Sequence, residues 1–181
     1  YRKIYPDFFE NLKIEPIKDY PKIITDAMNH VNTGGINVVL TPGRFNSAYY
    51  EHSYLAQKSG AYLVRAHELV VIDKKVYFKN YDGQKILVGS IYRRLDDDFI
   101  DPKFFNPESL IGVPGLIEAY LAGNVALMNA VGNGVADDKG IYYFVPKMIK
   151  YYLNEEPILQ NAPTYLPYFE KDMDYVMNNM E

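Results

Sequence analysis

The sequence is constrained most by its short apolar runs, which alternate with helical patterns. Residues 36–40 read Ile-Asn-Val-Val-Leu, a run typical of a strand buried in a sheet. Before this run, apolar residues recur with the period of a helix over 21–32, and Gly34-Gly35 follows as a stop signal. Alternation of this kind predicts an α/β fold, because parallel strands are joined by helical crossovers.

The remaining patterns complete this prediction. We expect strands at 61–64, 69–72, 76–80, 85–92 and 125–128, and helices ending at Gly60, at 115–122 and at 168–180. Tyr81-Asp82-Gly83 is a hairpin signal and predicts an antiparallel addition to the sheet. The predicted fold class is α/β, a three-layer Rossmann-like domain with a mostly parallel sheet and an added antiparallel hairpin.

Proline and capping residues predict where other elements begin and end. Asn46 or Ser47 can cap the helix that follows the first strand. Pro146 lacks an N–H, so we expect one helix to stop near Phe144 and another to start at the proline. Residues 1–20 contain two further prolines and are expected to be irregular.

Charge and composition exclude several classes of function. The net charge of −4 over 181 residues leaves no basic surface for nucleic acid or anionic lipid. Cys is absent, which removes disulfides and thiolate chemistry and fits a reducing compartment. No apolar run reaches the roughly 20 residues that cross a bilayer. We therefore expect a cytoplasmic protein that binds neither nucleic acid nor membrane.

Three polar segments follow predicted strands, which is where ligands of open α/β sheets bind. The first, 41–47, supplies Gly43 for close backbone approach, a cation, and a helix N-terminus at Asn46. These are the parts of an anion cradle. The alternative is a plain strand-to-helix turn that Asn46 caps.

The second segment, 92–102, places Arg93 and Arg94 just before three consecutive aspartates. Guanidinium groups bind carboxylate or phosphate oxygens in pairs, and clustered carboxylates can hold Mg²⁺ or orient an arginine. The alternative is a solvated charged loop. The functional interpretation is favoured by position, because the run begins where a core strand stops.

The third segment, 129–139, begins at Asn129 and ends at Asp137-Asp138-Lys139. Asp137 occupies the place of the third glycine in a G-x-G-x-x-G motif, so the dinucleotide fingerprint fails. Carboxylates at a helix N-terminus also compete with phosphate for the N–H groups. The segment therefore suits a cation, an amine, or an aspartate that anchors the loop, and Asp137 or Asp138 can cap a helix beginning at Lys139.

Other catalytic motifs fail. The sequence contains no P-loop, no H-E-x-x-H and no G-x-S-x-G motif. Residues 97–101 match D-D-x-x-D, which holds Mg²⁺ in prenyl-diphosphate synthases. There the motif occurs as a pair on long helices, whereas this single copy follows a strand and runs into Pro102. The three histidines are scattered, and we expect them to be surface or core-edge residues rather than metal ligands.

Several motifs in order resemble the circularly permuted ATP-grasp type 2 proteins, a family related to glutathionylspermidine synthase. The likeness spans residues 5–165. The chain also opens without a methionine, so we expect it to be an internal or trimmed piece of such a protein. The motifs are LTPG with YYEH, YRR through DDDF to DP, GVPGL, GNV, GxGVADDK, EEPIL and PTY, at residues 40–43 with 49–52, 92–102, 112–116, 123–125, 132–139, 155–159 and 163–165.

The resemblance implies an ATP-dependent ligase that activates a carboxylate as an acyl phosphate and passes it to an amine, with Mg²⁺ neutralising the phosphates. Residues 1–165 would form the pre-ATP-grasp-like α/β domain, and 166–181 a connector or short helix leading to the ATP-binding region. The lysine-bearing strand and glycine-rich lid of that region are not visible after Tyr165. The chain alone is expected to be inactive and to bind no cofactor tightly. Its partners would be small acid and amine substrates and the remainder of its own chain.

The position of 41–47, 93–101 and 129–139 after predicted strands predicts one cleft in which they meet, and the resemblance implies roles for residues of that cleft. Arg93 and Arg94 would grip the substrate carboxylate or the acyl phosphate. A non-catalytic small-molecule-binding module and a degenerate pseudo-ligase stay open as alternatives. The aspartates that would orient those arginines or contact Mg²⁺ are Asp96, Asp97 and Asp98, and the substrate-binding set is Gly43, Asn46, Asn129, Asn133, Asp137, Asp138 and Lys139.

Overall fold

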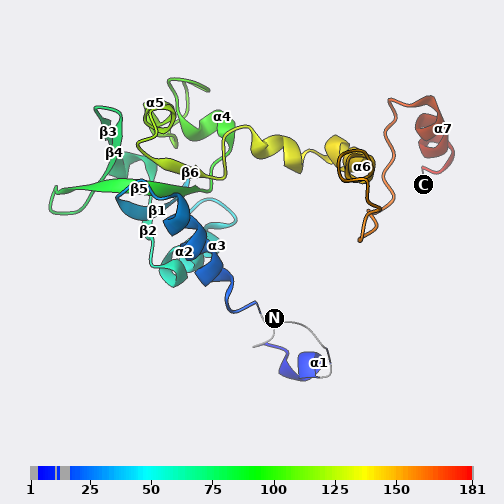
Figure 1. The fold of residues 1–181 in the computed structure, drawn as a ribbon, viewed down its shortest axis with the longest axis horizontal. Coiled ribbons are helices and arrows are strands. Elements are labelled where there is room, and N and C mark those ends of the chain that lie inside the picture. Colours follow the sequence, from blue (N-terminus) through cyan, green and yellow to red (C-terminus); the bar gives the residue numbers. More distant parts are fainter. Residues whose placement is uncertain (1–3, 11, 13–16, 181) are drawn as a thin grey trace. The chain divides into compact units, whose positions relative to one another are not determined.

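The structure, a computed structural model, describes residues 4–10, 12 and 17–180. The chain divides into two compact units, Tyr1–Asn129 and Ala130–Glu181, which are described separately. Figure 1 colours both along the sequence.

The first unit is built on a mixed sheet of six strands among the described residues. Four strands run parallel in the order β2-β1-β5-β6. β4 pairs antiparallel with the first residues of β5, and β3 pairs antiparallel with β4. This arrangement confirms the predicted parallel core with an added hairpin. The strands are β1 (Ile36–Leu40), β2 (Tyr62–Val64), β3 (Leu69–Ile72), β4 (Lys75–Lys79), β5 (Lys85–Arg93) and β6 (Ala126–Met128).

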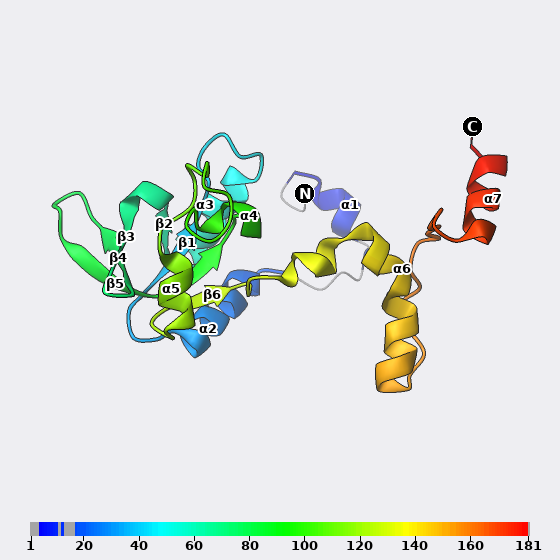
Figure 2. The same cartoon turned by 90° about the horizontal axis from the view of Figure 1, so that it is seen from above.

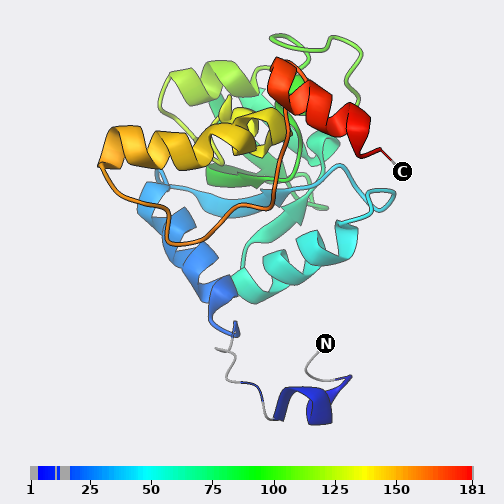
Figure 3. The same ribbon diagram turned by 90° about the vertical axis from the view of Figure 1, so that its right-hand side faces the viewer.

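Helices cover both faces of this sheet, which confirms the α/β class and the layered arrangement. α2 (Tyr20–Val31) and α3 (Tyr49–Ser59) lie on one face, and α5 (Leu116–Leu121) lies on the other (Figures 1 and 3). On the α2/α3 side, Met28 and Val39 are fully buried and pack in one apolar cluster with Leu55. On the α5 side, Leu116 is fully buried.

The turn between α2 and β1 explains why two glycines follow the helix. The Oδ1 atom of Asn32 accepts hydrogen bonds from the N–H groups of Gly34 and Gly35, at 2.7 and 3.0 Å. A Cβ atom on Gly35 would lie 2.5 Å from the carbonyl oxygen of Leu87. Gly35 is therefore required by the close approach of this turn to β5, and the pair does more than end the helix.

Two local predictions for the first unit are wrong, and one short helix was not predicted. α3 begins at Tyr49 with Ala48 as its N-cap, because Asn46 forms an earlier turn in which its Oδ1 accepts from the N–H of Ala48 at 2.9 Å. A short helix, α1 (Pro6–Glu10), occupies part of the segment expected to be irregular, of which residues 1–3, 11 and 13–16 lie outside the described part. A second short helix, α4 (Asp97–Ile100), forms within the charged run.

The second unit is helical. Its elements are η2 (a 3₁₀ helix, Asn133–Asp137), α6 (Lys139–Met148), η3 (a π-helical turn, Ile149–Leu153) and α7 (Glu170–Asn178). Phe169 packs against Tyr143 and Phe144, with ring centroids 5.9 and 6.5 Å apart, and Tyr165 stacks on Tyr175 at 4.3 Å. Across the described part of the chain, no helix combines the length and apolar character that a membrane span requires.

The prediction that Pro146 divides two helices is wrong. α6 passes through the proline and continues directly into η3, as Figure 2 shows. A proline at this position leaves the carbonyl of Tyr142, four residues earlier, without its usual helical donor. The side-chain amide of Asn161 donates to that carbonyl at 2.9 Å instead. The missing hydrogen bond is thus replaced from elsewhere in the chain, and the helix survives.

Candidate functional site at the strand ends

The parallel strands of the first unit bring several predicted residues to one edge of the sheet. Leu40 at the end of β1 pairs in register with Arg93 at the end of β5, and Tyr92 pairs with Met128 of β6. The N–H of Arg94 continues this pairing by donating to the carbonyl of Leu40 at 2.9 Å. The segments that follow these strands therefore start side by side, as the sequence predicted for 41–47, 93–101 and Asn129.

Arg93 is buried and directs its guanidinium into the protein. Its Nε donates to the carbonyl of Asn129 and its Nη1 to the carbonyl of Leu95, both at 2.7 Å. Its Nη2 lies 2.6 Å from Oδ1 of Asp97. All three nitrogens thus contact protein oxygens, so Arg93 fastens the ends of β5 and β6 and the start of α4 to one another.

Arg94 lies on the other side of the same edge, because side chains of consecutive residues in an extended segment point in opposite directions. Its Nη2 pairs with Oε1 of Glu51 at 2.8 Å, and its guanidinium lies 5.8 Å from the ring centre of Tyr92. Its enclosed Nε has no hydrogen-bond partner among the described residues. The two adjacent arginines therefore have separate surroundings and do not form a single grip.

The predicted aspartates are likewise separated. Asp97 pairs with Arg93, while Asp96 and Asp98 are exposed. Nowhere in residues 4–10, 12 and 17–180 do three or more His, Cys, Asp or Glu side chains gather as a metal site would require. The magnesium role of Asp96, Asp97 and Asp98 remains a prediction.

The sequence did not single out Asp101 for a role in this region. It is fully buried, and its carboxylate accepts from the N–H groups of Lys103, Gly115 and Ile117 at 2.9, 3.1 and 2.9 Å. A buried carboxylate with three backbone donors is fully engaged in holding a loop. Its position directly before Pro102, where a turn is expected, was the available signal.

The segment 41–47 is held by a buried histidine. The hydroxyl of Thr41 lies 2.8 Å from Nδ1 of His52 and accepts from the N–H of Gly43 at 3.2 Å. Both Thr41 and His52 are 1% exposed. Burial lowers the pKa of His52, and the charge of Arg94 lowers it further against an opposing effect of Glu51. His52 was expected at the surface or the core edge, yet it lies inside and fixes the geometry of the predicted loop.

A hollow of about 420 Å³ opens beside this loop, lined by Pro42, Gly43, Arg44, Phe45 and Arg65. Gly43 adopts a φ of +108°, which favours glycine, and a Cβ there would touch the side chain of Arg65 at 3.8 Å. Arg65 was not among the residues predicted from the sequence. It directly follows β2, so the rule that pointed to Arg93 after β5 would have found it.

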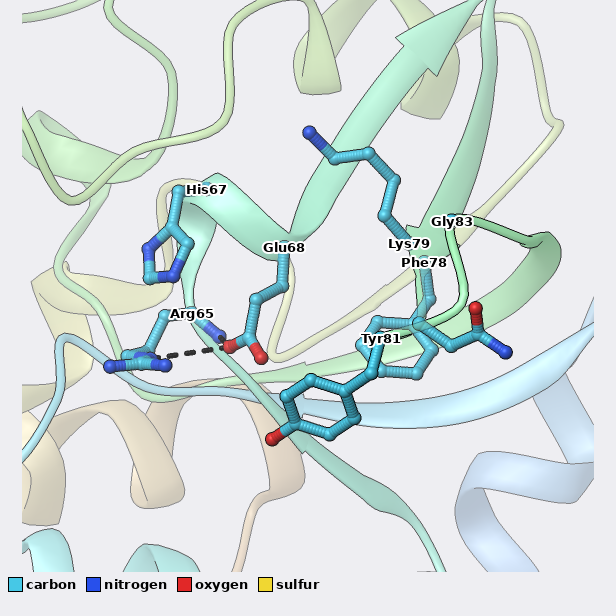
Figure 4. Close-up of a pocket in the computed structure, with 8 residues that line it drawn as sticks. Arg65, His67, Glu68, Phe78, Lys79, Tyr81 and Gly83 are labelled. Carbon is cyan, nitrogen blue, oxygen red and sulfur yellow. Dashed lines mark hydrogen bonds and ion pairs between the residues drawn. The ribbon is translucent and has the colours of Figure 1, made fainter.

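Arg65 also lines a second hollow, of about 410 Å³, near the β4–β5 hairpin. Figure 4 shows Phe78 and Tyr81 among the residues that line it, and the ion pair from Arg65 to Glu68. The other residues lining this hollow are His67, Lys79, Asn80 and Gly83. Two hollows thus meet at one arginine that precedes a short 3₁₀ helix, η1 (Ala66–Glu68).

Four predicted substrate-binding residues belong to the second unit. Asp138 caps α6, as predicted, by accepting from the N–H groups of Gly140 and Ile141 at 2.8 and 3.0 Å. The ammonium of Lys139 lies 2.6 Å from the carbonyl and 3.3 Å from the carboxylate of Asp137. Asn133 begins η2. These hydrogen bonds all join near neighbours in the chain, and the substrate roles of the four residues remain predictions.

Comparison with known proteins gives consistent relationships. An uncharacterised protein of Synechocystis sp. is 49% identical over 99% of this chain, and one of Mycobacterium tuberculosis is 40% identical over 98%. A protein of Frankia casuarinae, whose name describes a candidate glutamate–cysteine ligase, is 38% identical over 79% of the chain. The chain spans 38%, 33% and 16% of the lengths of these three relatives.

The family comparison covers the whole chain. A family model described as "a circularly permuted ATPgrasp" matches residues 1–181. The match agrees with the layered α/β unit and with the motifs at its strand ends. The chain therefore belongs to the circularly permuted ATP-grasp family.

Proposed function

We propose that this chain is the substrate-side part of an ATP-dependent carboxylate–amine ligase that acts through an acyl phosphate. Membership of the ATP-grasp family supports the use of ATP, and the name of the Frankia relative supports formation of a carbon–nitrogen bond. The observation that carries the proposal is the shared edge of β1, β5 and β6, where the loop of Gly43 lies close to the two arginines and Asn129.

The proposed reaction requires positive charge at this edge of the sheet. A carboxylate oxygen of the acid attacks the terminal phosphorus of ATP, and ADP leaves. The amine nitrogen then attacks the acyl carbon, phosphate leaves, and the amine gives up a proton. Both steps build negative charge on oxygens, so fixed cations lower the barrier. Mg²⁺ supplies charge neutralisation when it is bound, and the exposed carboxylates of Asp96 and Asp98 are oxygen ligands of the kind it prefers.

The geometry divides the proposed roles of the two arginines. Arg93 uses its three nitrogens within the protein, so in this proposal it is a positioning residue that aligns Asn129 with the end of β5. Arg94 is partly exposed and holds only one close ion pair, so it is the better candidate to contact the acid or its phosphate. The Glu51 carboxylate would orient Arg94 in the absence of substrate.

The remaining assignments follow the family. Residues 1–165 would form the pre-ATP-grasp-like domain, and 166–181 would lead to the region that binds ATP. Gly43 and Asn46 would border the acid, and the second-unit residues would border the amine, where Asp137 and Asp138 suit a cation. In this arrangement the isolated chain binds no cofactor tightly and turns over no ATP. The partners are small acid and amine substrates and the rest of the same polypeptide.

The test is phosphate release by the full-length protein with Mg-ATP and a panel of acids and amines. We expect turnover in one acid–amine pair, and none from this chain alone. Arg94→Ala should lower kcat/KM at least about 100-fold, because a fixed cation is lost from the transition state. The matched control is Lys75→Ala, an exposed cation on β4, which should leave the rate unchanged.

Three results would contradict the proposal or part of it. Full turnover by Arg94→Ala would remove that residue from the site. Binding of Mg-ATP by the full-length protein without transfer to any amine would favour a pseudo-ligase, and binding of a small molecule without ATP would favour a non-catalytic module.

A further inference from the structure

The guanidinium groups of the first unit differ in how far they are already engaged. Arg93 contacts three protein oxygens, and Arg94 pairs with Glu51. The structure gives Arg44 no hydrogen bond or ion pair within the described ranges, only the neighbouring ring of Phe45 at 5.0 Å. Arg65 pairs through its Nε with Glu68 at 3.2 Å. Besides Arg94, donors still available for a ligand are therefore at Arg44 and Arg65.

These two arginines line one hollow. The hollow of about 420 Å³ beside β1 and β2 is bordered by five residues, of which the two charged ones are both arginines. No carboxylate among the described residues lines it, whereas Glu68 lines the neighbouring hollow near the hairpin. A concave surface with two cations and no opposing charge favours an anion.

The backbone beside the arginines gives the hollow a fixed wall. Gly43 adopts a φ of +108°, a conformation that favours glycine, and a Cβ there would lie 3.8 Å from the side chain of Arg65. The N–H of Gly43 is fixed by the hydroxyl of Thr41, which the buried His52 contacts at 2.8 Å. The hollow therefore has an ordered wall that is anchored in the core of the unit.

We propose that Arg44 and Arg65, on either side of Gly43, form a binding site for a small anion that carries a carboxylate or a phosphoryl group. Each guanidinium offers paired N–H donors that match two oxygens of such a group. Glu68 accepts from the Nε of Arg65 and does not line this hollow, which leaves the terminal nitrogens of Arg65 for the ligand. This site uses guanidinium groups other than those of Arg93 and Arg94, and it shares Gly43 with the proposed acid site. The experiment measures binding alone, so its outcome does not depend on the ligase chemistry.

The experiment titrates this chain with inorganic phosphate and with succinate, followed by the amide resonances of residues 42–45 and the Nε–H resonances of arginine. We expect saturable shifts at Gly43 and at both arginines. Arg44→Gln and Arg65→Gln should each weaken binding about tenfold, the loss expected for a charged hydrogen-bonding contact. Both side chains are exposed, so the fold should be unchanged in thermal unfolding followed by circular dichroism.

The matched control is Lys79→Gln. Lys79 lines the neighbouring hollow but not this one, so its variant should bind within about twofold of the parent chain. The tighter of the two anions identifies the group for which the site is built. Equal weakening by all three variants would show a diffuse effect of charge and would overturn the proposal. Absence of saturable binding for both anions would overturn it as well.

Discussion

The two units of the chain contrast in what holds their polar residues in place. In the first unit, Met28, Val39 and Ile91 are completely buried, and the strand-end residues are attached to that core. In the second, none of residues 130–180 is buried. A side chain that is anchored to a core keeps its position because many contacts must break together, whereas a locally bonded one depends on one or two hydrogen bonds.

This difference shows in two cations. Arg93 is enclosed and joins three segments through three contacts. The ion-pair partners Lys139 and Asp137 are 85% and 94% exposed in their side chains, so solvent screens their interaction. Geometry in the first unit should therefore persist through most substitutions at the surface, and geometry in the second should respond to single local changes.

The largest effect is expected from the core of the first unit. Ile91→Ala in β5 should lower the free energy of unfolding by about 3–4 kcal/mol, because it leaves a cavity in a fully buried position. Hydrogen exchange of α6 should be unchanged if the units are as independent as their burial suggests. Equal loss of protection in both units would break the comparison. Urea unfolding combined with amide exchange measures both quantities.

A smaller loss is expected at the strand ends. Arg93→Met should lower the free energy of unfolding by about 2–3 kcal/mol. The substitution removes the cation that pairs with Asp97 and the donors to the carbonyls of Asn129 and Leu95. Amide exchange should rise around Leu95 and Asn129 before it rises in α2. The control is Arg65→Met, an exposed arginine, for which unfolding in urea should change by less than about 1 kcal/mol. Stability of Arg93→Met equal to that control would show that the contacts of Arg93 do not anchor this edge.

In the second unit, loss of the helix cap at Asp138 is expected to lower the stability of α6 by about 1 kcal/mol. Asp138→Ala removes the side chain that accepts from the N–H groups of Gly140 and Ile141 in the first turn of α6, so the helix should fray from its start. Asp138→Asn keeps an acceptor and is the matched control. Exchange rates of Gly140 and Ile141 measure the effect. Unchanged rates in Asp138→Ala would mean that contacts other than the cap hold this end.

The smallest effect is a dependence of stability on pH that is confined to the first unit. The folded pKa of His52 lies below its usual value, so the unfolded chain binds the proton more readily. This contribution is complete above about pH 6.5 and is lost as the pH falls towards the folded pKa. All three histidines lie in the first unit, so the protection of amides in the second, corrected for the pH dependence of intrinsic exchange, should not change between about pH 7.5 and 5.5. His52→Gln should flatten the slope, and a slope unaltered by it would assign the effect to another group.

The sequence predicted elements best where pattern and packing agree. The run at 36–40 became β1, and the continuous apolar stretch after the hairpin became the long β5, because both lie in the buried part of the sheet. The prediction that Pro146 divides two helices was wrong because of a residue far along the chain. No local rule could show that Asn161 would supply the donor that Pro146 lacks.

At the candidate site, too, some features could be predicted from the sequence and others could not. The segments after β1 and β5 could be predicted to adjoin, because parallel strands end at one edge. The direction of each side chain could not be predicted. Arg93 and Arg94 were therefore treated as one pair, although side chains alternate along a strand and the two have different surroundings. Arg65 was missed although a strand was expected at 61–64, because the rule for residues that follow strands was not applied there. The burial of His52 depends on packing that no motif encodes.

The replacement hydrogen bond at Tyr142 also has a consequence for the spacing of residues. Asn161 donates to a carbonyl nineteen positions earlier, so this hydrogen bond joins the two ends of the segment 143–160. Substitutions within this segment should leave the hydrogen bond in place. Inserting or deleting a residue should move the Asn161 amide away from Tyr142, and α6 should then break at Pro146. Length, more than chemical identity, is what this stretch has to preserve.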